Sequence, residues 1–178
     1  HINGTKTWVT SGENSDGFIV VCKNEDTSPE NKQMSMYLVP ANAKGVTIEP
    51  LNKIGMQIMP FSKVIFDDVV VDESALLGIE GKGFLQLMKN FEWERCVLLA
   101  ELLGEAQAAM DDACAWTNER QQFGKGIKTF QLVQEHIVEM QIELTNTRNF
   151  LYRTCWKMDN GIPVNNDAAM LKRYGAPA

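Results

Sequence analysis

Three short stretches of this 178-residue sequence contain residue types that could take part in chemistry. Residues 7–12 alternate a large aromatic side chain, Trp8, with hydroxyls such as that of Thr10. Residues 91–95 place two carboxylates and a guanidinium within four positions, and residues 119–124 combine an arginine with a phenyl ring. Aromatic rings suit contact with a flat ring system, and a guanidinium suits a phosphate or carboxylate. Together these types would suit a ligand with both a ring and phosphates.

Each stretch also has a simpler structural explanation when it is taken alone. Trp8 could be a core residue beside a turn threonine, the carboxylates could lie on a solvated helix face, and Arg120 could form a surface ion pair. His136 shares a helical face with Val133 and Met140, where a single histidine is usually structural. With two histidines and no CxxC pair, the sequence predicts no metal site.

The first part of the chain, residues 5–71, is predicted to form short strands separated by glycine, proline, asparagine and aspartate. The predicted strands cover residues 6–11, 17–23, 33–39, 45–50 and 63–71. Strands of this length and spacing favour an antiparallel β-sandwich or barrel piece. The polar residues 24–32, which include Pro29, are predicted to form an exposed hairpin loop.

After Gly83 the pattern becomes helical, so the fold class is α+β. One helix is predicted from about residue 82 to 118, entered through a glycine-rich turn at 78–83 and containing Gly104 at a cost of about 1 kcal/mol. Residues 122–128 are predicted to be a loop. A second long helix carries one apolar stripe, as antiparallel bundle helices do: Val133, Ile137, Met140, Leu144, Thr147, Leu151 and Met158.

Residues 160–163 are predicted to end the second helix, and a third is predicted to begin with Asn165 or Asn166 as its cap. Because this last helix is short, we expect the chain to be part of a longer protein. The hydrophobic fraction of 44% and charged fraction of 22% fit a packed protein, and the net charge of -6 argues against a nucleic-acid binder. No apolar run reaches the roughly 18–20 residues of a membrane span, and no secretory signal begins the sequence. The four scattered cysteines are expected to be free, buried or half-buried thiols in a reducing compartment.

In this order and on these elements, the three stretches resemble the acyl-CoA dehydrogenase family. That family has an aromatic-Ile/Val-Thr strand in a middle β-domain, then an acidic-x-x-Arg helix and an Arg-x-x-Phe-Gly turn in a C-terminal helical domain. Residues 53–55, 64–69, 76–78, 81–84 and 104–107 follow the family pattern as well. The resemblance implies a partial middle domain at 1–78 and a partial C-terminal domain at 79–178. Segments 130–135, 156–161 and 167–170 are more specifically similar to crotonobetainyl-CoA reductases.

The resemblance implies FAD as cofactor and assigns seven residues to it: Trp8, Val9, Thr10, Arg120, Gln122, Phe123 and Gln131. Trp8 would pack on the isoalloxazine, while the Thr10 hydroxyl and the Val9 backbone would serve the N5 region. Arg120 would meet the pyrophosphate and Phe123 the adenine side of the FAD of a neighbouring subunit. Gln122 and Gln131 would contact the same FAD. The family thus implies a homo-oligomer, usually a tetramer built as a dimer of dimers.

For the substrate, the resemblance implies that Glu92 and Arg95 contact the CoA part of an acyl-CoA thioester. Glu94 stands in the position from which a minority of family members take the substrate α-proton, whereas most use a glutamate nearer the C-terminus. Its neighbours Phe91 and Leu98 suggest a partly desolvated setting. The family also implies an electron-transferring flavoprotein as partner, a role in fatty acid metabolism, and a bacterial cytoplasmic or mitochondrial matrix location.

Some positions depart from the family pattern, and other functions stay open. Gln57 and Pro60-Phe61 stand where the family often has arginine and serine or threonine, which affects loop geometry and substrate fit. The leading hypothesis is α,β-dehydrogenation of a short-chain acyl-CoA, or the reverse enoyl-CoA reduction. The alternatives are a non-catalytic flavin-binding or oligomerisation scaffold, and a related flavin hydroxylase or nitroalkane oxidase. Glu94 beside Arg95, with Glu92 before it, favours a CoA thioester over the last two.

Overall fold

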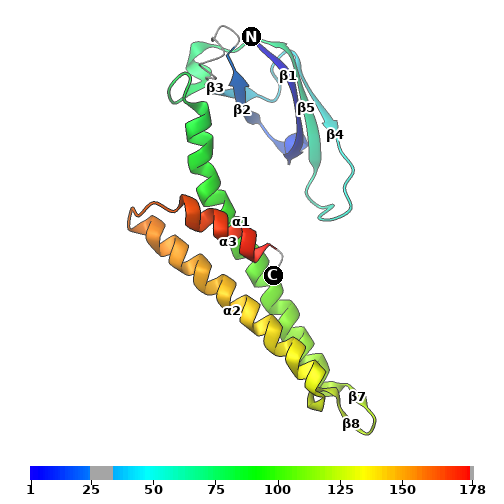
Figure 1. The fold of residues 1–178 in the computed structure, drawn as a ribbon. Coiled ribbons are helices and arrows are strands. Elements are labelled where there is room, and N and C mark those ends of the chain that lie inside the picture. Colours follow the sequence, from blue (N-terminus) through cyan, green and yellow to red (C-terminus); the bar gives the residue numbers. More distant parts are fainter. Residues whose placement is uncertain (25–33, 177–178) are drawn as a thin grey trace. The chain divides into compact units, whose positions relative to one another are not determined.

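The computed structural model describes residues 1–24 and 34–176 and divides into two compact units, His1–Leu87 and Met88–Ala178. The first unit is built of strands and the second of helices (Figure 1). Both the antiparallel strands and the long helices confirm the predicted α+β class. The hairpin predicted at 24–32 lies, apart from Asn24, outside the described residues.

Two three-stranded sheets form the β unit, and every strand pair in them is antiparallel. The first sheet has the order β1-β5-β4, with β1 at Ile2–Thr10, β5 at Phe61–Val69 and β4 at Val46–Pro50. The second has the order β2-β3-β6, with β2 at Gly17–Lys23, β3 at Met34–Pro40 and β6 at Leu76–Leu77. Short 3-10 turns occupy Gly12–Asn14 and Glu73–Ala75.

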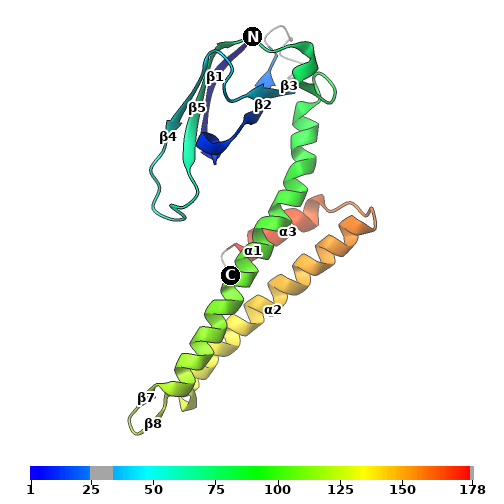
Figure 2. The same cartoon turned by 180° about the vertical axis from the view of Figure 1, so that it is seen from behind.

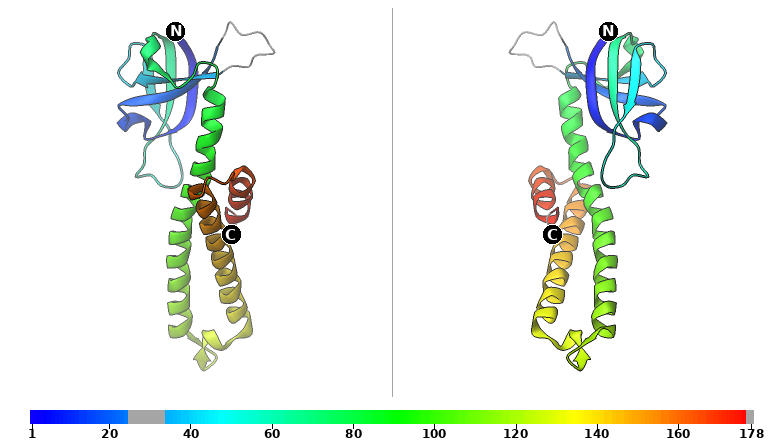
Figure 3. Two further views of the ribbon diagram at one scale, coloured as in Figure 1. Left: turned by 90° about the vertical axis from the view of Figure 1, so that its left-hand side faces the viewer. Right: turned by 90° about the vertical axis from the view of Figure 1, so that its right-hand side faces the viewer.

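The core of the β unit lies between these two sheets, which face each other as two layers (Figure 3). Alternate residues of β5 point inward, so that Ser62, Val64 and Phe66 are buried, as the two-residue period of a strand requires. Phe66 meets Phe18 of the opposite sheet edge-on, with ring centroids 6.3 Å apart. This pair packs across the core between the two sheets.

Three helices follow: α1 at Gly83–Glu119, α2 at Gln131–Asp159 and α3 at Asn165–Gly175. A two-residue hairpin, β7 (Gln121–Gln122) and β8 (Lys125–Gly126), and a 3-10 turn at Ile127–Thr129 connect α1 to α2. The helix α1 begins where its first residue passes close to β3, since a Cβ on Gly83 would stand 2.8 Å from the Met34 carbonyl oxygen. Just before it, Gly78 and Gly81 have positive φ values of 78° and 73°, so the predicted glycine turn feeding this helix is confirmed.

Within the helical unit, α1 and α2 lie side by side and α3 packs against them (Figure 2). The buried core draws on all three helices: Cys96, Leu99, Leu103, Met110, Leu144, Leu151, Ala168 and Leu171. Arg148 of α2 donates a hydrogen bond of 2.7 Å to the Gln107 side-chain oxygen of α1. Lys157 of α2 donates to both carboxylate oxygens of Asp167 in α3, at 2.7 and 2.9 Å. These two contacts tie α2 to each of its neighbours.

The predicted element bounds hold to within a few residues. The helix predicted at 82–118 is observed one residue later at each end, while β1 begins four residues earlier than predicted. The apolar stripe of α2 is buried or half-buried except at Met140, which is 38% exposed. The predicted cap of α3 is corrected, because Val164 occupies the N-cap and Asn165 is already helical. No helix in the described part of the chain is long and apolar enough to cross a membrane.

Candidate functional site

Trp8 stands at a kink near the end of β1. The pairing of β1 with β5 shifts between Lys6 and Val9, and Trp8 at this shift has a positive φ of 61°. The indole is 64% exposed and lies beside the Phe61 ring, with centroids 6.0 Å apart. A bulky residue in this backbone region costs about 1–3 kcal/mol and is found mainly where function requires it. The simpler explanation of Trp8 as a core residue is therefore wrong.

The other two residues of this stretch continue the strand toward the first 3-10 turn. Val9 is half-buried and packs against the core between the sheets, whereas Thr10 is exposed. Val9 and Thr10 pair with Ser62 and Phe61 of β5. The strand end thus presents an outward indole and an accessible hydroxyl from a backbone that the sheet holds in place.

The loop that departs from the family pattern lies next to this strand end. The Ser11 N–H donates to the Pro60 carbonyl at 2.7 Å, and the Lys53 amino group lies 4.9 Å from the Phe61 ring centroid. Gln57 is exposed, and its neighbour Met56 has a positive φ of 47°. Pro60 and Phe61 therefore anchor the loop to β1, while the residues before them reach into solvent.

In α1, the side chains of residues 91–95 differ in how far they are buried. Phe91, Glu92 and Arg95 are half-buried, and the Arg95 guanidinium lies 5.9 Å from the Phe91 ring centroid, one helical turn away. Glu94 is exposed, and Leu98 is 42% exposed. The described residues therefore leave Glu94 in solvent and do not supply the partly desolvated setting that the sequence suggests.

Arg95 also lines an open hollow between α1 and α3. This hollow has a volume of about 570 Å³ and is lined by Arg95, Lys172 and Arg173 together with Ala169 and Ala176. None of the three cations forms an ion pair within the part of the chain that the structure describes. Sequence reasoning missed Lys172 and Arg173, because only the packing of α3 brings this basic pair close to Arg95. Three cations around one hollow suit an anionic group.

Arg120 connects the end of α1 to the hairpin. Its N–H donates to the Trp116 carbonyl and its own carbonyl accepts from the Ile127 N–H, each at 2.9 Å. Its guanidinium lies 6.0 Å from the Trp116 ring centroid and has no carboxylate partner among the described residues. The surface ion pair considered for Arg120 is not observed within the described part of the chain, where its charge is therefore available to a ligand.

Phe123 occupies the tip of the same hairpin. Gln122 pairs with Lys125, and the two residues between them, Phe123 and Gly124, have φ values of 53° and 76°. Two positive φ values correspond to the type I′ turn that two-residue hairpins favour. The Phe123 side chain is 91% exposed and meets the Phe130 ring edge-on at 6.2 Å. The turn thus holds a phenyl ring out in solvent.

Gln131 is the first residue of α2 and is exposed. The chain reaches it from the hairpin through Phe130, whose ring lies 4.6 Å from the Lys125 amino group. Arg120, Phe123 and Gln131 therefore lie on one connection of the helical unit. The structure brings these predicted residues together locally, as it does Trp8, Val9 and Thr10 in the β unit.

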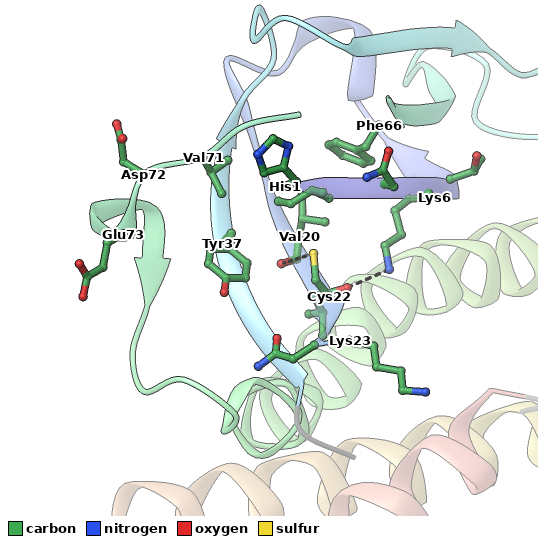
Figure 4. Close-up of a pocket in the computed structure, with 16 residues that line it drawn as sticks. His1, Lys6, Val20, Cys22, Lys23, Tyr37, Phe66, Val71, Asp72 and Glu73 are labelled. Carbon is green, nitrogen blue, oxygen red and sulfur yellow. Dashed lines mark hydrogen bonds between the residues drawn. The ribbon is translucent and has the colours of Figure 1, made fainter. Parts of the chain in front are cut away.

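The β unit also contains a hollow that the sequence did not predict. It opens between the sheets, with a volume of about 830 Å³, and none of the predicted site residues lines it. Figure 4 shows Lys6 reaching across it, where its amino group donates to the Val21 carbonyl at 3.0 Å. Burial raises the pKa of the neighbouring Cys22 thiol. The described residues include no cluster of three metal-ligating side chains, here or elsewhere.

Comparison with known proteins assigns a family to both units. Residues 1–69 match the model of the acyl-CoA dehydrogenase middle domain, and residues 81–178 match that of the acyl-CoA dehydrogenase C-terminal domain. Among solved structures, butyryl-CoA dehydrogenase from Megasphaera elsdenii is 31% identical with a TM-score of 0.91, over 98% of this chain and 46% of its own. An acyl-CoA dehydrogenase from Slackia heliotrinireducens is 38% identical with a TM-score of 0.85, over 97% and 45% of the two chains.

A third similar structure contains a flavin. It is PigA with FAD and proline, 30% identical with a TM-score of 0.91, over 97% of this chain and 46% of PigA. The chain therefore spans less than half the length of each of these relatives. Both domain matches, together with the fold and the order of the site stretches, show that this chain belongs to the acyl-CoA dehydrogenase family.

Proposed function

We propose that the protein containing this chain catalyses FAD-dependent α,β-dehydrogenation of a short-chain acyl-CoA thioester, or the reverse enoyl-CoA reduction. The observation that carries the proposal is the outward-facing indole of Trp8, which is 64% exposed on a backbone with a φ of 61°. A strained position that exposes a large apolar ring suits a flat ligand stacked against it. An isoalloxazine is such a ligand, and the Thr10 hydroxyl stands two residues away to donate a hydrogen bond.

The hairpin of the helical unit fits the other end of FAD. The Arg120 guanidinium, which has no carboxylate partner among the described residues, suits a pyrophosphate, and the exposed Phe123 ring suits an adenine. Gln122 and Gln131 would add hydrogen bonds from the same connection. We place these four residues on the FAD of a neighbouring subunit, so that the complete site requires a homo-oligomer, with a tetramer as the expected form.

The cationic hollow beside α1 supports a CoA ester as substrate. CoA carries several phosphate charges, and Arg95, Lys172 and Arg173 line one hollow without carboxylate partners among the described residues. Glu92, half-buried on the same helix, would accept hydrogen bonds from the CoA part. The resemblance assigned Arg95 to CoA, and the two cations of α3 extend that assignment.

In the reaction, Glu94 would act as the general base that removes the substrate α-proton. FAD, when bound, supplies the chemistry that accepts the β-hydride. The remaining tasks of this chain are to hold the thioester with Glu92 and Arg95 and to hold the flavin ring with Trp8. Because Glu94 is exposed in this chain, the water around it must be displaced when substrate binds, which would make the carboxylate a stronger base.

An electron-transferring flavoprotein as electron acceptor, a role in fatty acid metabolism and a cytoplasmic or mitochondrial matrix location follow from the family resemblance alone. We also place the boundary between the two domains at Leu77-Gly78, ahead of the glycine turn. The second candidate function is a non-catalytic flavin-binding scaffold, which the same exposed rings would serve. It differs from the enzyme in one respect, because a scaffold would not transfer electrons from a thioester.

The test uses the full-length protein purified with its flavin. Anaerobic addition of a saturated short-chain acyl-CoA should bleach the oxidised flavin absorbance, whereas a scaffold would keep its colour. Arg120→Ala should lower the flavin retained after gel filtration, because a charge-assisted contact to the pyrophosphate is lost without a core cavity. Arg153→Ala, which removes another exposed arginine of the helical unit, is the matched control. Equal flavin content in the wild type and Arg120→Ala would contradict the assignment of Arg120.

A further inference from the structure

The helix α2 has an exposed stripe on the side opposite the core. The residues that α2 buries in the core are Leu144, Thr147, Leu151 and Thr154. Exposed residues recur on the other side in alternating steps of four and three residues, and these six form the exposed stripe: Val138, Ile142, Thr145, Asn149, Tyr152 and Trp156. This spacing is the one by which a helix packs along another helix. The proposed reaction uses none of the six.

The exposed stripe is symmetric about its centre. Thr147, which faces the core, lies two residues from Thr145 and two from Asn149. If a second α2 lies antiparallel on the stripe, with a two-fold axis at the level of Thr147, every member of the stripe meets another member. The same pairs repeat on either side of the axis: Val138 with Trp156, Ile142 with Tyr152, and Thr145 with Asn149. The aliphatic side chains thus meet aromatic rings, and the polar side chains meet each other.

The sizes of these side chains fit such a contact. The small polar residues are nearest the axis, where two crossing helices are closest, and the rings of Tyr152 and Trp156 lie farther out. The aliphatic and aromatic members are each at least half exposed. The stripe extends along about 27 Å of one helix face. An exposed apolar row of this length marks a contact with another protein chain.

Charged side chains beside the stripe are complementary in the same register. Arg153 and Glu139 are exposed and flank the stripe on one side, in opposite halves of the helix. The two-fold axis sets Arg153 of one copy about 3 Å along the helix axis from Glu139 of the other. Within the described part of the chain, Arg153 has no ion pair and Glu139 has only one, to His136 at 3.5 Å. An exposed pair of this kind adds little affinity, but it favours the antiparallel register.

The same register brings together residues of the proposed site from two copies. Arg148 of α2 donates a hydrogen bond to Gln107 of α1, so the end of α2, about twelve residues after Arg148, lies near the level of Arg95. The two-fold axis sets Gln131, at the beginning of one α2, next to the end of the other. The connection that carries Arg120 therefore reaches the end of the second copy at which Arg95 stands. An FAD shared between subunits, as proposed above, requires two copies to meet in this way.

We propose that the exposed stripe of α2 is a two-fold interface, on which α2 of a second copy of this chain packs antiparallel with the axis at the level of Thr147. The proposal names the contact surface and the register of the homo-oligomer, and to that extent it rests on the proposed function. A further segment of the full-length protein is the alternative occupant of the stripe.

The experiment measures the mass of the full-length, FAD-loaded protein by light scattering and then cross-links one predicted pair. In the double variant Ile142→Cys, Tyr152→Cys, a bismaleimide that spans about the 8–10 Å between packed helices should join two chains. Each single variant is the matched control, because the two copies of residue 142 are about 15 Å apart along the helix axis. Trypsin should release residues 129–148 linked to residues 149–153, and neither peptide contains a native cysteine.

A charge placed in the stripe gives a second measurement. Ile142→Asp should weaken self-association by about tenfold or more, because the carboxylate loses water at the interface without gaining a partner. Met170→Asp, at a residue of α3 that is 53% exposed against 50% for Ile142, should leave the mass unchanged.

The possible failures are distinguishable, and none of the measurements depends on flavin reduction. An oligomer whose double variant links no more than the single variants would overturn the interface and leave the homo-oligomer of the proposed function standing. A wild type with the mass of a monomer would overturn both. Thiols introduced at residues 142 and 152 that do not react at all would show that another segment covers the stripe, which also overturns the proposal.

Discussion

The two units of this chain reach stability in different ways. In the β unit, the core lies between two sheets, and large apolar side chains such as Phe18 and Phe66 are enclosed between them. The helical unit has one core, between α1, α2 and α3, and leaves Trp93, Trp116 and Trp156 more than half exposed. Large exposed apolar surfaces mark contacts with other protein. A homo-oligomer, as proposed above, could cover these rings, and it could equally cover the exposed Ile54 and Ile58 of the β unit.

The largest expected effect comes from a cavity in the core of the helical unit. Leu99 is 1% exposed, whereas the preceding residue, Leu98, is 42% exposed. Leu99→Ala should destabilise the helical unit by about 2–5 kcal/mol, because it leaves a cavity in the core. Leu98→Ala should cost less than about 1 kcal/mol in the isolated chain. The measurement is the denaturation midpoint, followed by helical circular dichroism. Equal shifts of the midpoint in the two variants would contradict the burial of Leu99 in this core.

The second test concerns the ion pair between α2 and α3. The hydrogen bond from Lys157 holds the pKa of Asp167 below its ordinary value, and the two side chains are 20% and 11% exposed. Asp167→Asn should cost about 2–3 kcal/mol at neutral pH, between the values for exposed and fully buried pairs. It removes the charge while keeping the shape of the side chain.

The same pair predicts a pH dependence. Because the folded pKa of Asp167 is depressed, its contribution to stability is complete above the unfolded pKa of about 3.9. That contribution is lost as the pH falls through the lower, folded pKa. Thermal melts at neutral and strongly acidic pH should therefore show the gap between wild type and Asp167→Asn closing in acid. A gap that is independent of pH would mean that the ion pair is not its source.

The smallest effect compares two glycines, one in each unit. A Cβ on Gly4 of β1 or on Gly104 of α1 would meet no described residue within 4 Å, but Gly4 has a φ of 142°. Gly4→Ala should destabilise the β unit by about 1–2 kcal/mol through backbone strain. Gly104→Ala should stabilise α1 by up to about 1 kcal/mol. Melting temperatures that shift in opposite directions would confirm this contrast, and shifts of the same sign would contradict it.

Periodicity alone predicted most of the fold. Apolar residues recur at helical spacing over the many turns of α1, and this repeat predicted both ends of the helix to within one residue. The ends of β1 and β5 were less predictable, since strand bounds depend on partners far along the chain. Val164 as the cap of α3 could not be seen in the sequence, where Asn165 and Asn166 are the better cap types.

The candidate site was only partly predictable. Residue types and family pattern selected Trp8 and Arg120, but the positive φ that turns the Trp8 indole outward depends on a register shift that no local motif encodes. Lys172 and Arg173 join Arg95 only through the packing of α3, about 77 residues along the chain by the residue numbers. The exposure of Glu94 likewise depends on which elements cover α1.

The proposed reaction depends on Glu94 as the base that takes the substrate α-proton. The measurement is anaerobic stopped-flow mixing of the full-length, FAD-loaded protein with a saturated short-chain acyl-CoA, comparing wild type, Glu94→Gln and Glu101→Gln. Glu101 is another exposed glutamate of α1, and its variant should reduce the flavin at the wild-type rate. We expect Glu94→Gln to slow flavin reduction by about 10²–10⁴-fold while the flavin stays bound, since the general base is lost. Flavin reduction by Glu94→Gln at close to the wild-type rate would show that another carboxylate is the base.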